Sequence, residues 1–244
     1  MSDGIGAINF KLGEGRAASP WSPERKRLYC ELDRLWKRGR ELLGCEIAIM
    51  GGAMTWVSER NLVAAISNAG GFGVIASGSM SPELLSLEIG ATKAMTTRPF
   101  GVNLITLHPQ LLELIDVCTD HRVDHVVLAG GLPSSAAVAR IKQGGARVVC
   151  FAPALGFARK LVRMGVDAIV IEGNEAGGHI GPVSTGVLAQ EILPHKATPE
   201  MRAIAHIKKK YPGNGSRRAG AGNFEVLVGP HAVQYIGGIP QAAC

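Results

Sequence analysis

The chain has 244 residues, 46% of them hydrophobic and 19% charged, and its formal net charge is +6. This is the composition of a globular protein, and no apolar run approaches the 18 or more residues that a membrane-spanning helix needs. The basic excess belongs to residues 195–244, where seven Lys or Arg and two Glu give +5 and leave +1 for the rest. We therefore expect neither a nucleic-acid partner nor a membrane partner.

The N-terminus and the cysteines indicate the compartment. Residues 1–15 lack the cationic start and the apolar core of a secretory signal peptide. The cysteines are odd in number and show no CxxC pairing, which favours free thiols in a reducing compartment. They are Cys30, Cys45, Cys118, Cys150 and Cys244. We expect a cytoplasmic protein with Cys150 in a buried strand.

The first 44 residues precede the repeating part of the chain. Residues 1–21 are glycine-rich and polar, and we expect them to form a surface arm. From Ser22 the sequence predicts a helix, because Ser22 is a good cap, Pro23 suits a first turn and Gly44 ends the pattern. A helix before the first strand plugs the bottom of a barrel or packs alongside it. We assign residues 1–44 to an N-terminal arm and helix.

Apolar strand candidates and amphipathic helix patterns then alternate about every 24 residues. The strands are expected to begin near Glu46, Phe72, Phe100, Asp124, Ala146 and Val166. The helices are expected over residues 58–69, 81–96, 109–119, 134–143, 154–164 and 184–193, with Ser58 and Ser81 among the caps. The alternation predicts parallel βαβ units, and six of them indicate an α/β fold of the TIM-like (β/α) barrel type. An open doubly wound sheet is the rival fold, but Gly51-Gly52-Ala53-Met54 does not match its GxGxxG loop.

Glycines follow the first, second, fourth and sixth expected strands. In a parallel barrel these loops open onto one mouth, where a wide planar cofactor needs backbone edges without Cβ atoms. Asn103 is a polar residue in an otherwise apolar strand, and because a buried amide requires a partner, we expect a ligand contact there. His108, His121 and His125 lie at helix and loop ends without a carboxylate or cysteine cluster, so we expect them to be solvated and expect no metal site.

The stretch Ile169–Gly181 joins an apolar strand to a loop with two carboxylates, a glycine pair and His179. A histidine just past the carboxyl end of a buried strand can exchange protons near neutral pH, although spacing alone equally allows a tight turn whose histidine caps a helix. The string GNEAGGHIGPVST resembles the signature of the nitronate monooxygenase (2-nitropropane dioxygenase) family, which shares its fold with the flavin-dependent enoyl-ACP reductases. The resemblance continues through FAPALGFARKLVRMGVDAIVIEG, RPFGVNLIT and GGAMTWVSERNLVAAISNAGGFGVIA, and it covers about residues 45–194.

The resemblance implies that residues 45–194 form an FMN-binding barrel core with His179 as the catalytic base. The backbone of the first glycine loop would line the flavin ring, Asn103 would hydrogen-bond it, and Glu172 would take a ribityl hydroxyl. The implied cofactor-binding residues are Gly52, Ala53, Met54, Asn103, Glu172, Gly177 and Gly178.

The activity that the resemblance implies is the oxidation of alkyl nitronates by O₂ to carbonyl compounds and nitrite, with His179 removing the α-proton of a neutral nitroalkane. An NAD(P)H-dependent flavin enoyl-ACP reductase is the alternative in the same fold, and rapid NADH oxidation with crotonyl thioesters would select it. A non-catalytic barrel remnant that acts as a binding or assembly subunit is the alternative from another class. Absence of bound flavin at any FMN concentration would favour the remnant.

The tail departs from the family pattern. Family members continue past the sixth helix into two strands that end in AGGIG-like and GTRF-like loops, whose backbone N–H groups bind the FMN phosphate. Neither loop follows at that spacing here, and the basic, glycine-rich, divergent tail at residues 195–244 has only NFEVLVG and AVQYIGG as strand-like runs. Strands seven and eight are therefore not recognisable. We expect coil over residues 195–222, or at most one short helix around Glu200 to Lys210. We also expect an incomplete barrel, impaired FMN binding and activity, and open sheet edges that favour a homo-oligomer.

Overall fold

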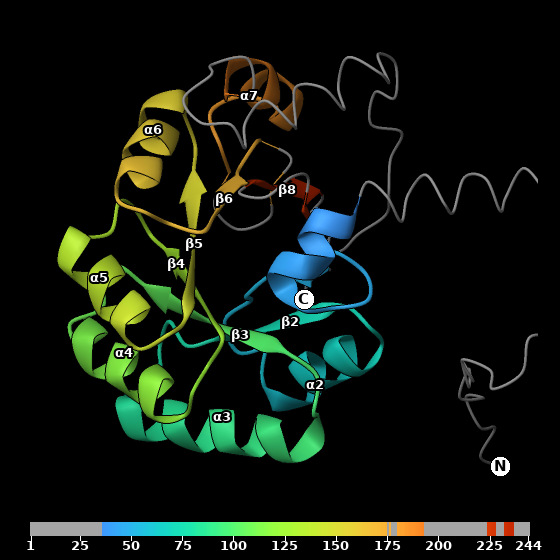
Figure 1. Ribbon diagram of the computed structural model, residues 1–244, viewed down its shortest axis with the longest axis vertical. Helices are drawn as coiled ribbons and strands as arrows, with labels where there is room; N and C mark the ends of the chain where they lie inside the picture. Colours follow the sequence, from blue (N-terminus) through green and yellow to red (C-terminus); the bar gives the residue numbers. More distant parts are fainter. Residues whose placement is uncertain (1–35, 175, 177–179, 193–223, 228–231, 237–244) are drawn as a thin grey trace, which may run out of the picture. The chain divides into compact units, whose positions relative to one another are not determined.

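Six parallel strands follow one another in sequence order, and a helix follows each of them (Figure 1). The computed structural model describes residues 36–174, 176, 180–192, 224–227 and 232–236, all within one unit, Leu35–Cys244. The six strands are β1 (Ile49–Gly51), β2 (Phe72–Ala76), β3 (Phe100–Ile105), β4 (His125–Ala129), β5 (Arg147–Ala152) and β6 (Ala168–Ile171). The helices are α2 (Arg60–Asn68), α3 (Pro82–Met95), α4 (Leu111–Asp120), α5 (Ser135–Gln143), α6 (Leu155–Arg163) and α7 (Thr185–Ile192).

The six predicted βα units of a TIM-like barrel are confirmed, and each pair of neighbours from β1 to β6 is parallel. The predicted cap Ser81 is confirmed, and Ser134, the predicted first residue of its helix, is a cap as well. Ser81 accepts a hydrogen bond from the backbone N–H of Leu84 ahead of Pro82, and Ser134 accepts one from Ala137. These side chains satisfy backbone donors that have no partner within the helix.

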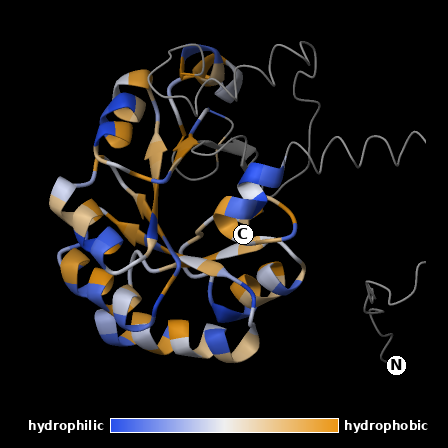
Figure 2. Cartoon of the chain, viewed as in Figure 1, coloured by the Kyte–Doolittle hydropathy of each residue, from blue (hydrophilic) through white to orange (hydrophobic). Residues whose placement is uncertain are grey.

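Alternate residues of β4, β5 and β6 pack into two separate cores. Val126, Val148 and Ile169 belong to the core between the sheet and the surrounding helices. Their neighbours Val127, Val149 and Val170 belong to the core inside the barrel. Figure 2 shows the same arrangement as apolar strands and helices with one apolar and one polar side. Strands buried on both faces explain why the sequence shows continuous apolar runs there. Among the described helices, none is long and apolar enough to cross a membrane.

Two strands of the tail close the sheet, which corrects the expectation of an incomplete, open barrel. The strands β7 (Phe224–Leu227) and β8 (Ala232–Ile236) pair with each other in an antiparallel manner. β8 lies parallel to β6 and β7 lies antiparallel to β1, so the strand order is β1-β2-β3-β4-β5-β6-β8-β7. Successive parallel strands need a crossover such as a helix between them, whereas an antiparallel pair needs only a short connection, so a tail without a barrel-length helix pattern can still close the sheet. The expected coil at residues 195–222 lies outside the described residues.

The described end of the N-terminal helix, residues 36–43, lies at the amino ends of β4 and β5. Leu43 is fully buried in the core inside the barrel. The carbonyl oxygen of Leu42 contacts His125 Nε2 at 2.7 Å and also accepts from Arg147 Nη1. Gly44 ends the helix with φ +71°. This part of the helix therefore sits at the bottom of the barrel, which is one of the two predicted placements.

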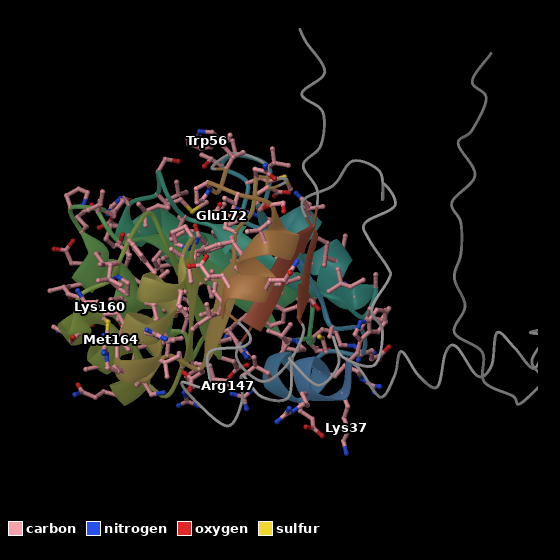
Figure 3. All side chains as sticks on the ribbon, turned by 90° about the horizontal axis from the view of Figure 1, so that it is seen from above. Lys37, Trp56, Arg147, Lys160, Met164 and Glu172 are labelled. Atoms are coloured by element: carbon pink, nitrogen blue, oxygen red, sulfur yellow. The ribbon has the colours of Figure 1, made fainter. Side chains whose placement is uncertain are left out.

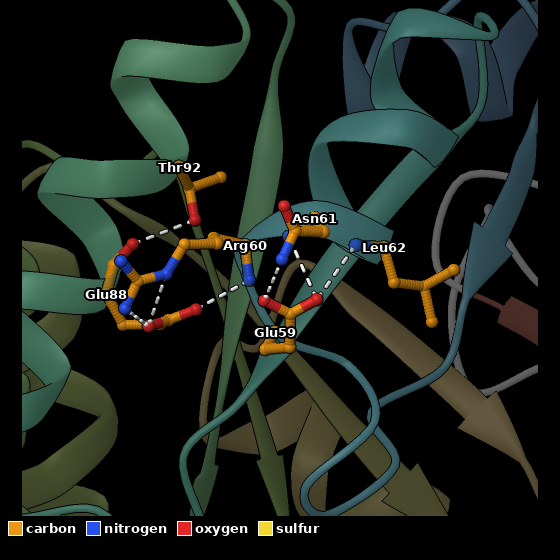
Figure 4. A network of polar contacts seen from close by, with 6 residues as sticks. All are labelled: Glu59, Arg60, Asn61, Leu62, Glu88 and Thr92. Carbon is orange, nitrogen blue, oxygen red and sulfur yellow. Dashed lines mark hydrogen bonds and ion pairs between the residues drawn. The ribbon is translucent and has the colours of Figure 1, made fainter.

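A buried carboxylate joins α2 to α3 (Figure 4). Glu88 accepts hydrogen bonds from the backbone N–H of Arg60 at 2.5 Å and from its guanidinium Nε at 3.0 Å. The start of α2 differs from the prediction, because Glu59 is the N-cap and accepts from Asn61 N and Leu62 N. Ser58, the predicted cap, instead holds the loop before the helix.

Candidate functional site

A cavity of about 750 Å³ opens at the carboxyl ends of the parallel strands. That volume is in the range of small-molecule and cofactor sites. Residues from five of the six βα loops, together with the ends of the strands, form its wall. The loop residues are Gly52, Ala53, Met54, Thr55, Gly78, Ser79, Gly130, Gly131, Pro153 and Glu172. The structure thus gathers four predicted glycines at one mouth, which is the end where barrel enzymes carry their chemistry.

Five of the eight predicted site residues line this cavity. They are Gly52, Ala53, Met54, Asn103 and Glu172. Figure 3 places Glu172 toward the same end of the barrel as Trp56, and Arg147 at the opposite end. Gly177, Gly178 and His179 lie outside the described residues. Their predicted roles therefore stay predictions, as do the roles of the five that line the cavity.

A buried serine fixes the loop after β1. The hydroxyl of Ser58, which is 3% exposed, donates to the carbonyl oxygen of Gly52 and accepts from the N–H of Met54, both at 3.0 Å. The carbonyl oxygen of Met54 accepts from the N–H groups of Val57 and Ser58. Both polar roles of the hydroxyl are used inside the loop, so the backbone that faces the cavity is held before any ligand arrives.

Asn103 projects from β3 into the barrel and is 6% exposed. Its Nδ2 donates to the carbonyl oxygen of Val127 at 3.1 Å, which ties β3 to β4. The Ser77 hydroxyl donates to the carbonyl oxygen of Asn103 at 2.5 Å. Within the described part of the chain, no group donates a hydrogen bond to the side-chain oxygen of Asn103. The carbonyl oxygen of Val127 therefore satisfies the amide nitrogen, and the side-chain oxygen is left to accept a hydrogen bond from a ligand in the cavity that Asn103 lines.

Two glycines in left-handed backbone conformations form the wall after β4. Gly130 has φ +85° and Gly131 has φ +122°, values that favour glycine over any residue with a side chain. A Cβ atom on Gly130 would lie 3.1 Å from Ile105 Cγ2, another residue of the cavity wall. The backbone here therefore approaches the cavity closely because no side chain intervenes.

The loop after β6 folds back on its own start. The carbonyl oxygen of Gly173 accepts from the N–H groups of Ala176 at 3.1 Å and Gly181 at 2.9 Å. Asn174 N donates to the carbonyl oxygen of Val183 at 2.8 Å. A Cβ atom at Gly181 would lie 2.0 Å from the carbonyl oxygen of Glu172, so only glycine fits. Both sides of the segment that carries the predicted base are thus anchored beside Glu172.

The structure corrects the expectation that His125 is solvated. His125 is 3% exposed, its Nδ1 has no hydrogen-bond partner among the described residues, and its ring meets Phe72 edge-on at 4.9 Å between centroids. Burial lowers the pKa of His125 below its ordinary value. His121 Nε2 contacts Ser86 Oγ, and His108 Nδ1 accepts a hydrogen bond from the N–H of Gln110.

The described cysteines are structural. Cys45, Cys118 and Cys150 are buried free thiols, and Cys150 is in the core as predicted. Burial raises the pKa of Cys118 and of Cys150 to about 12, so neither is a thiolate at neutral pH. They are therefore no candidates for nucleophiles.

Apolar side chains of the cavity wall were missed by the sequence analysis. Phe151 in β5, Phe157 in the first turn of α6 and Ile105 at the end of β3 all line the cavity. Each fits its strand or helix pattern, so the sequence alone gives no sign that it faces a ligand site rather than the core. The cavity lining combines polar groups, namely backbone and the Asn103 amide, with aromatic and aliphatic side chains. Such a lining suits a planar, partly apolar ligand.

Comparison with known proteins identifies the family. The family model described as nitronate monooxygenase matches residues 37–120 and 111–201, which cover more than half of the chain and all of the parallel strands β1–β6. The chain belongs to the nitronate monooxygenase family. This family is one of flavin-dependent oxidoreductases that act on small molecules, and the chain carries the core of such an enzyme.

Relatives in the family carry more than one activity in their names. The (3aS,4S,5R,7aS)-5-hydroxy-7a-methyl-1-oxo-octahydro-1H-indene-4-carboxyl-CoA dehydrogenase of Mycobacterium tuberculosis is 37% identical over 155 residues, which are 63% of this chain and 43% of that protein. The nitronate monooxygenase of Paraburkholderia phytofirmans is 31% identical over 178 residues, covering 57% of this chain and 49% of that protein. The chain thus spans about half the length of the curated relatives it matches.

Solved structures show the same fold. FabK from Thermotoga maritima is 38% identical with a TM-score of 0.62, over 64% of this chain and 50% of that chain. The nitroalkane oxidase of Streptomyces ansochromogenes superposes with a TM-score of 0.58 at 24% identity, over 66% of this chain and 58% of that chain, and so supports the fold alone. The TIM-like barrel is therefore the shared architecture.

Proposed function

We propose that this member of the nitronate monooxygenase family binds FMN in the cavity at the carboxyl ends of β1–β6 and oxidises alkyl nitronates with O₂ to a carbonyl compound and nitrite. The observation that carries the proposal is the cavity wall: glycine backbone from the loops after β1, β2 and β4 lines the same cavity as Asn103 and Glu172, at the mouth of a barrel of this family. Such a wall suits a flat ring that needs close backbone contact.

The described residues fit the ring end of FMN. The backbone of Gly52, Ala53 and Met54 would lie along the ring, and the side-chain oxygen of Asn103 would accept a hydrogen bond from it. Glu172 would take a ribityl hydroxyl. Bound FMN would supply the electron acceptor of the reaction. The segments that would meet the phosphate, after β7 and β8, fall outside the described residues.

The proton chemistry of the proposal rests with His179. A neutral nitroalkane must lose its α-proton before oxidation, and an imidazole has a pKa suited to that transfer at neutral pH. The anchored loop of Gly173 and Gly181 would present His179 from the side of the cavity where Glu172 lies. A preformed nitronate has already lost this proton and needs the base far less.

A CoA thioester is the second candidate substrate, because the dehydrogenase of M. tuberculosis is more similar to this chain than the nitronate monooxygenase of P. phytofirmans is. A thioester also carries an acidic hydrogen next to an electron-withdrawing group. His179 beside FMN would therefore serve both candidate substrates. The residues around the cavity opening would decide which of the two binds.

The proposal is tested on the purified chain in two steps. An absorbance spectrum with and without added FMN should show a bound flavin, and its saturation should give the stoichiometry. Anaerobic addition of ethylnitronate should then bleach the flavin, whereas bleaching by an acyl-CoA and not by nitronate would select the second candidate. Bleaching by NADH followed by reoxidation with crotonyl thioester would select the enoyl reductase. A chain that binds no FMN at any concentration would be the non-catalytic remnant.

A further inference from the structure

The most exposed large apolar side chains of the described part of the chain gather at the mouth. Leu107 is 83% exposed, Trp56 74% and Ile180 69%. They come from the loops after β3, β1 and β6, so they stand on different sides of the opening. Phe157, which lines the cavity, is itself 39% exposed. Single apolar residues on a surface are ordinary, but a group around a ligand cavity marks a binding surface.

The backbone at Trp56 adds an independent observation. Its φ is +64°, a left-handed conformation that is a rare choice for a bulky residue. Hydrogen bonds on both sides impose it, since the N–H groups of Val57 and Ser58 both donate to the carbonyl oxygen of Met54, and Ser58 bridges Gly52 and Met54. A glycine would take this conformation more easily. The loop therefore keeps the Trp56 side chain exposed to solvent although its backbone conformation is strained. Backbone strain of this kind concentrates at ligand sites.

The position of Trp56 connects it to the cavity. Met54 and Thr55, which precede it, line the cavity wall, and Figure 3 shows Trp56 at the outer end of the barrel beyond Glu172. The cavity wall carries the glycine backbone, Asn103 and Glu172. Phe157, which is partly exposed, and the exposed residues Leu107, Trp56 and Ile180 form what we call the rim. A ligand that fills this site would have its polar, reacting part inside and an apolar part at the rim.

We propose that Trp56 is a substrate-positioning residue, and that the substrate of this chain carries a bulky apolar group which packs on Trp56 at the mouth. The inference rests on the proposed function for the reacting group, but it concerns the rest of the substrate. It places small nitroalkanes such as nitroethane among poor substrates. A long alkyl chain or a fused ring attached to the reacting carbon fits this surface, because it buries the exposed indole of Trp56.

Substitution of Trp56 by glycine separates a binding role from a structural one. Trp56→Gly removes the ring and also suits the left-handed backbone, so the melting temperature should be unchanged or higher. KM for the nitronate of 1-nitrooctane should rise about tenfold, with KM for ethylnitronate and both kcat values unchanged, because an aromatic contact is lost only by the larger substrate. Trp56→Phe should restore most of the affinity. Leu87→Ala is the matched control, since Leu87 is 68% exposed but lies in the middle of α3.

A second measurement needs no turnover. In the Trp21→Phe, Trp36→Phe double variant, Trp56 is the only tryptophan, because the chain has three. 1-Nitrooctane should move its emission maximum to shorter wavelength with saturation, and nitroethane should not. If flavin never binds, the emission shift still tests this proposal by itself.

Equal changes of KM for both substrates in Trp56→Gly, or no emission shift with 1-nitrooctane, would overturn the proposal. So would a fall in melting temperature of Trp56→Gly with unchanged KM values, because Trp56 would then support the fold. An emission maximum that moves to longer wavelength on dilution of the protein alone would assign the rim to a contact between copies of the chain instead.

Discussion

The two ends of the barrel differ in what their side chains do. At the amino ends of β4 and β5, side chains bind other parts of the protein: His125 and Arg147 hold the end of the N-terminal helix. Nearby, Arg98 forms an ion pair with Glu46 at 2.7 Å. At the carboxyl ends, glycine backbone and Asn103 line a cavity, and the side chain of Trp56 is exposed to solvent. The first end is built for stability and the second for a ligand, which is the division expected in a (β/α) barrel.

The largest effect should follow from the base at the carboxyl end. His179→Asn should lower the rate with a neutral nitroalkane by about 10² to 10⁴, the usual contribution of a general base. The rate with a preformed nitronate should change far less, because no α-proton has to be removed. Steady-state rates on both forms of one nitroalkane measure this. Equal losses would show that His179 positions the substrate and does not act as a base.

The loop after β6 should be the next most sensitive place. Gly181→Ala would put a Cβ atom 2.0 Å from the carbonyl oxygen of Glu172, so the loop must move by an ångström or more. Displacement on that scale can lower a catalytic rate by about 10²-fold. Because Glu172 lines the cavity, we also expect a clearly larger flavin dissociation constant, measured by absorbance titration. Gly186→Ala in α7 is the matched control, because its Cβ would meet only Ser184 Oγ at 3.9 Å. Equal affinity in both variants would contradict the role of this loop.

Away from the mouth, a glycine substitution should change stability instead of binding. Gly73 in β2 packs against α2, and a Cβ atom there would lie 2.5 Å from the carbonyl oxygen of Val63. Gly73→Ala should lower the free energy of unfolding by about 1–3 kcal/mol, as overpacking does. Gly90→Ala in α3 is the control, since nothing lies within 4 Å of its Cβ position. That control should gain about 0.5–1 kcal/mol. Denaturant unfolding of both variants measures this difference. Equal losses of unfolding free energy would show that close packing around Gly73 does not destabilise the Gly73→Ala variant.

The smallest effect concerns the amino end and pH. Burial lowers the pKa of His125 below its ordinary 6.5, so the unfolded chain takes up the proton more readily than the folded one. Stability from the neutral ring is fully present above about pH 6.5 and is lost as pH falls toward the lowered pKa, by at most about 1.4 kcal/mol per pH unit. His125→Gln can keep the donor to Leu42 without titrating, so its denaturant melts should depend less on pH between 7 and 5. An unchanged slope would mean that other groups cause the loss.

Local sequence determined most of the barrel. Continuous apolar runs and helix patterns with caps such as Ser81 and Ser134 act within a few residues, so they fixed β1–β6 and α2–α7 to within a few positions. The parallel order of the strands then followed from the short βαβ connections. Gly52, Met54 and Glu172 were found for the same reason, since each stands past the end of a predicted strand, and Asn103 was found as a polar residue within one.

Only the tertiary structure decided how distant parts meet. Closure by β7 and β8 depends on pairing between the tail and β1 and β6, and no local pattern specifies such partners. The burial of His125 depends on a helix more than 80 residues earlier in the chain. Phe157 reads as an ordinary helix residue, and only the fold turns it toward the cavity. The sequence by itself determined which elements form and where their ends lie, because those depend on neighbours along the chain. Which surfaces they bury or leave open was decided by contacts across the barrel.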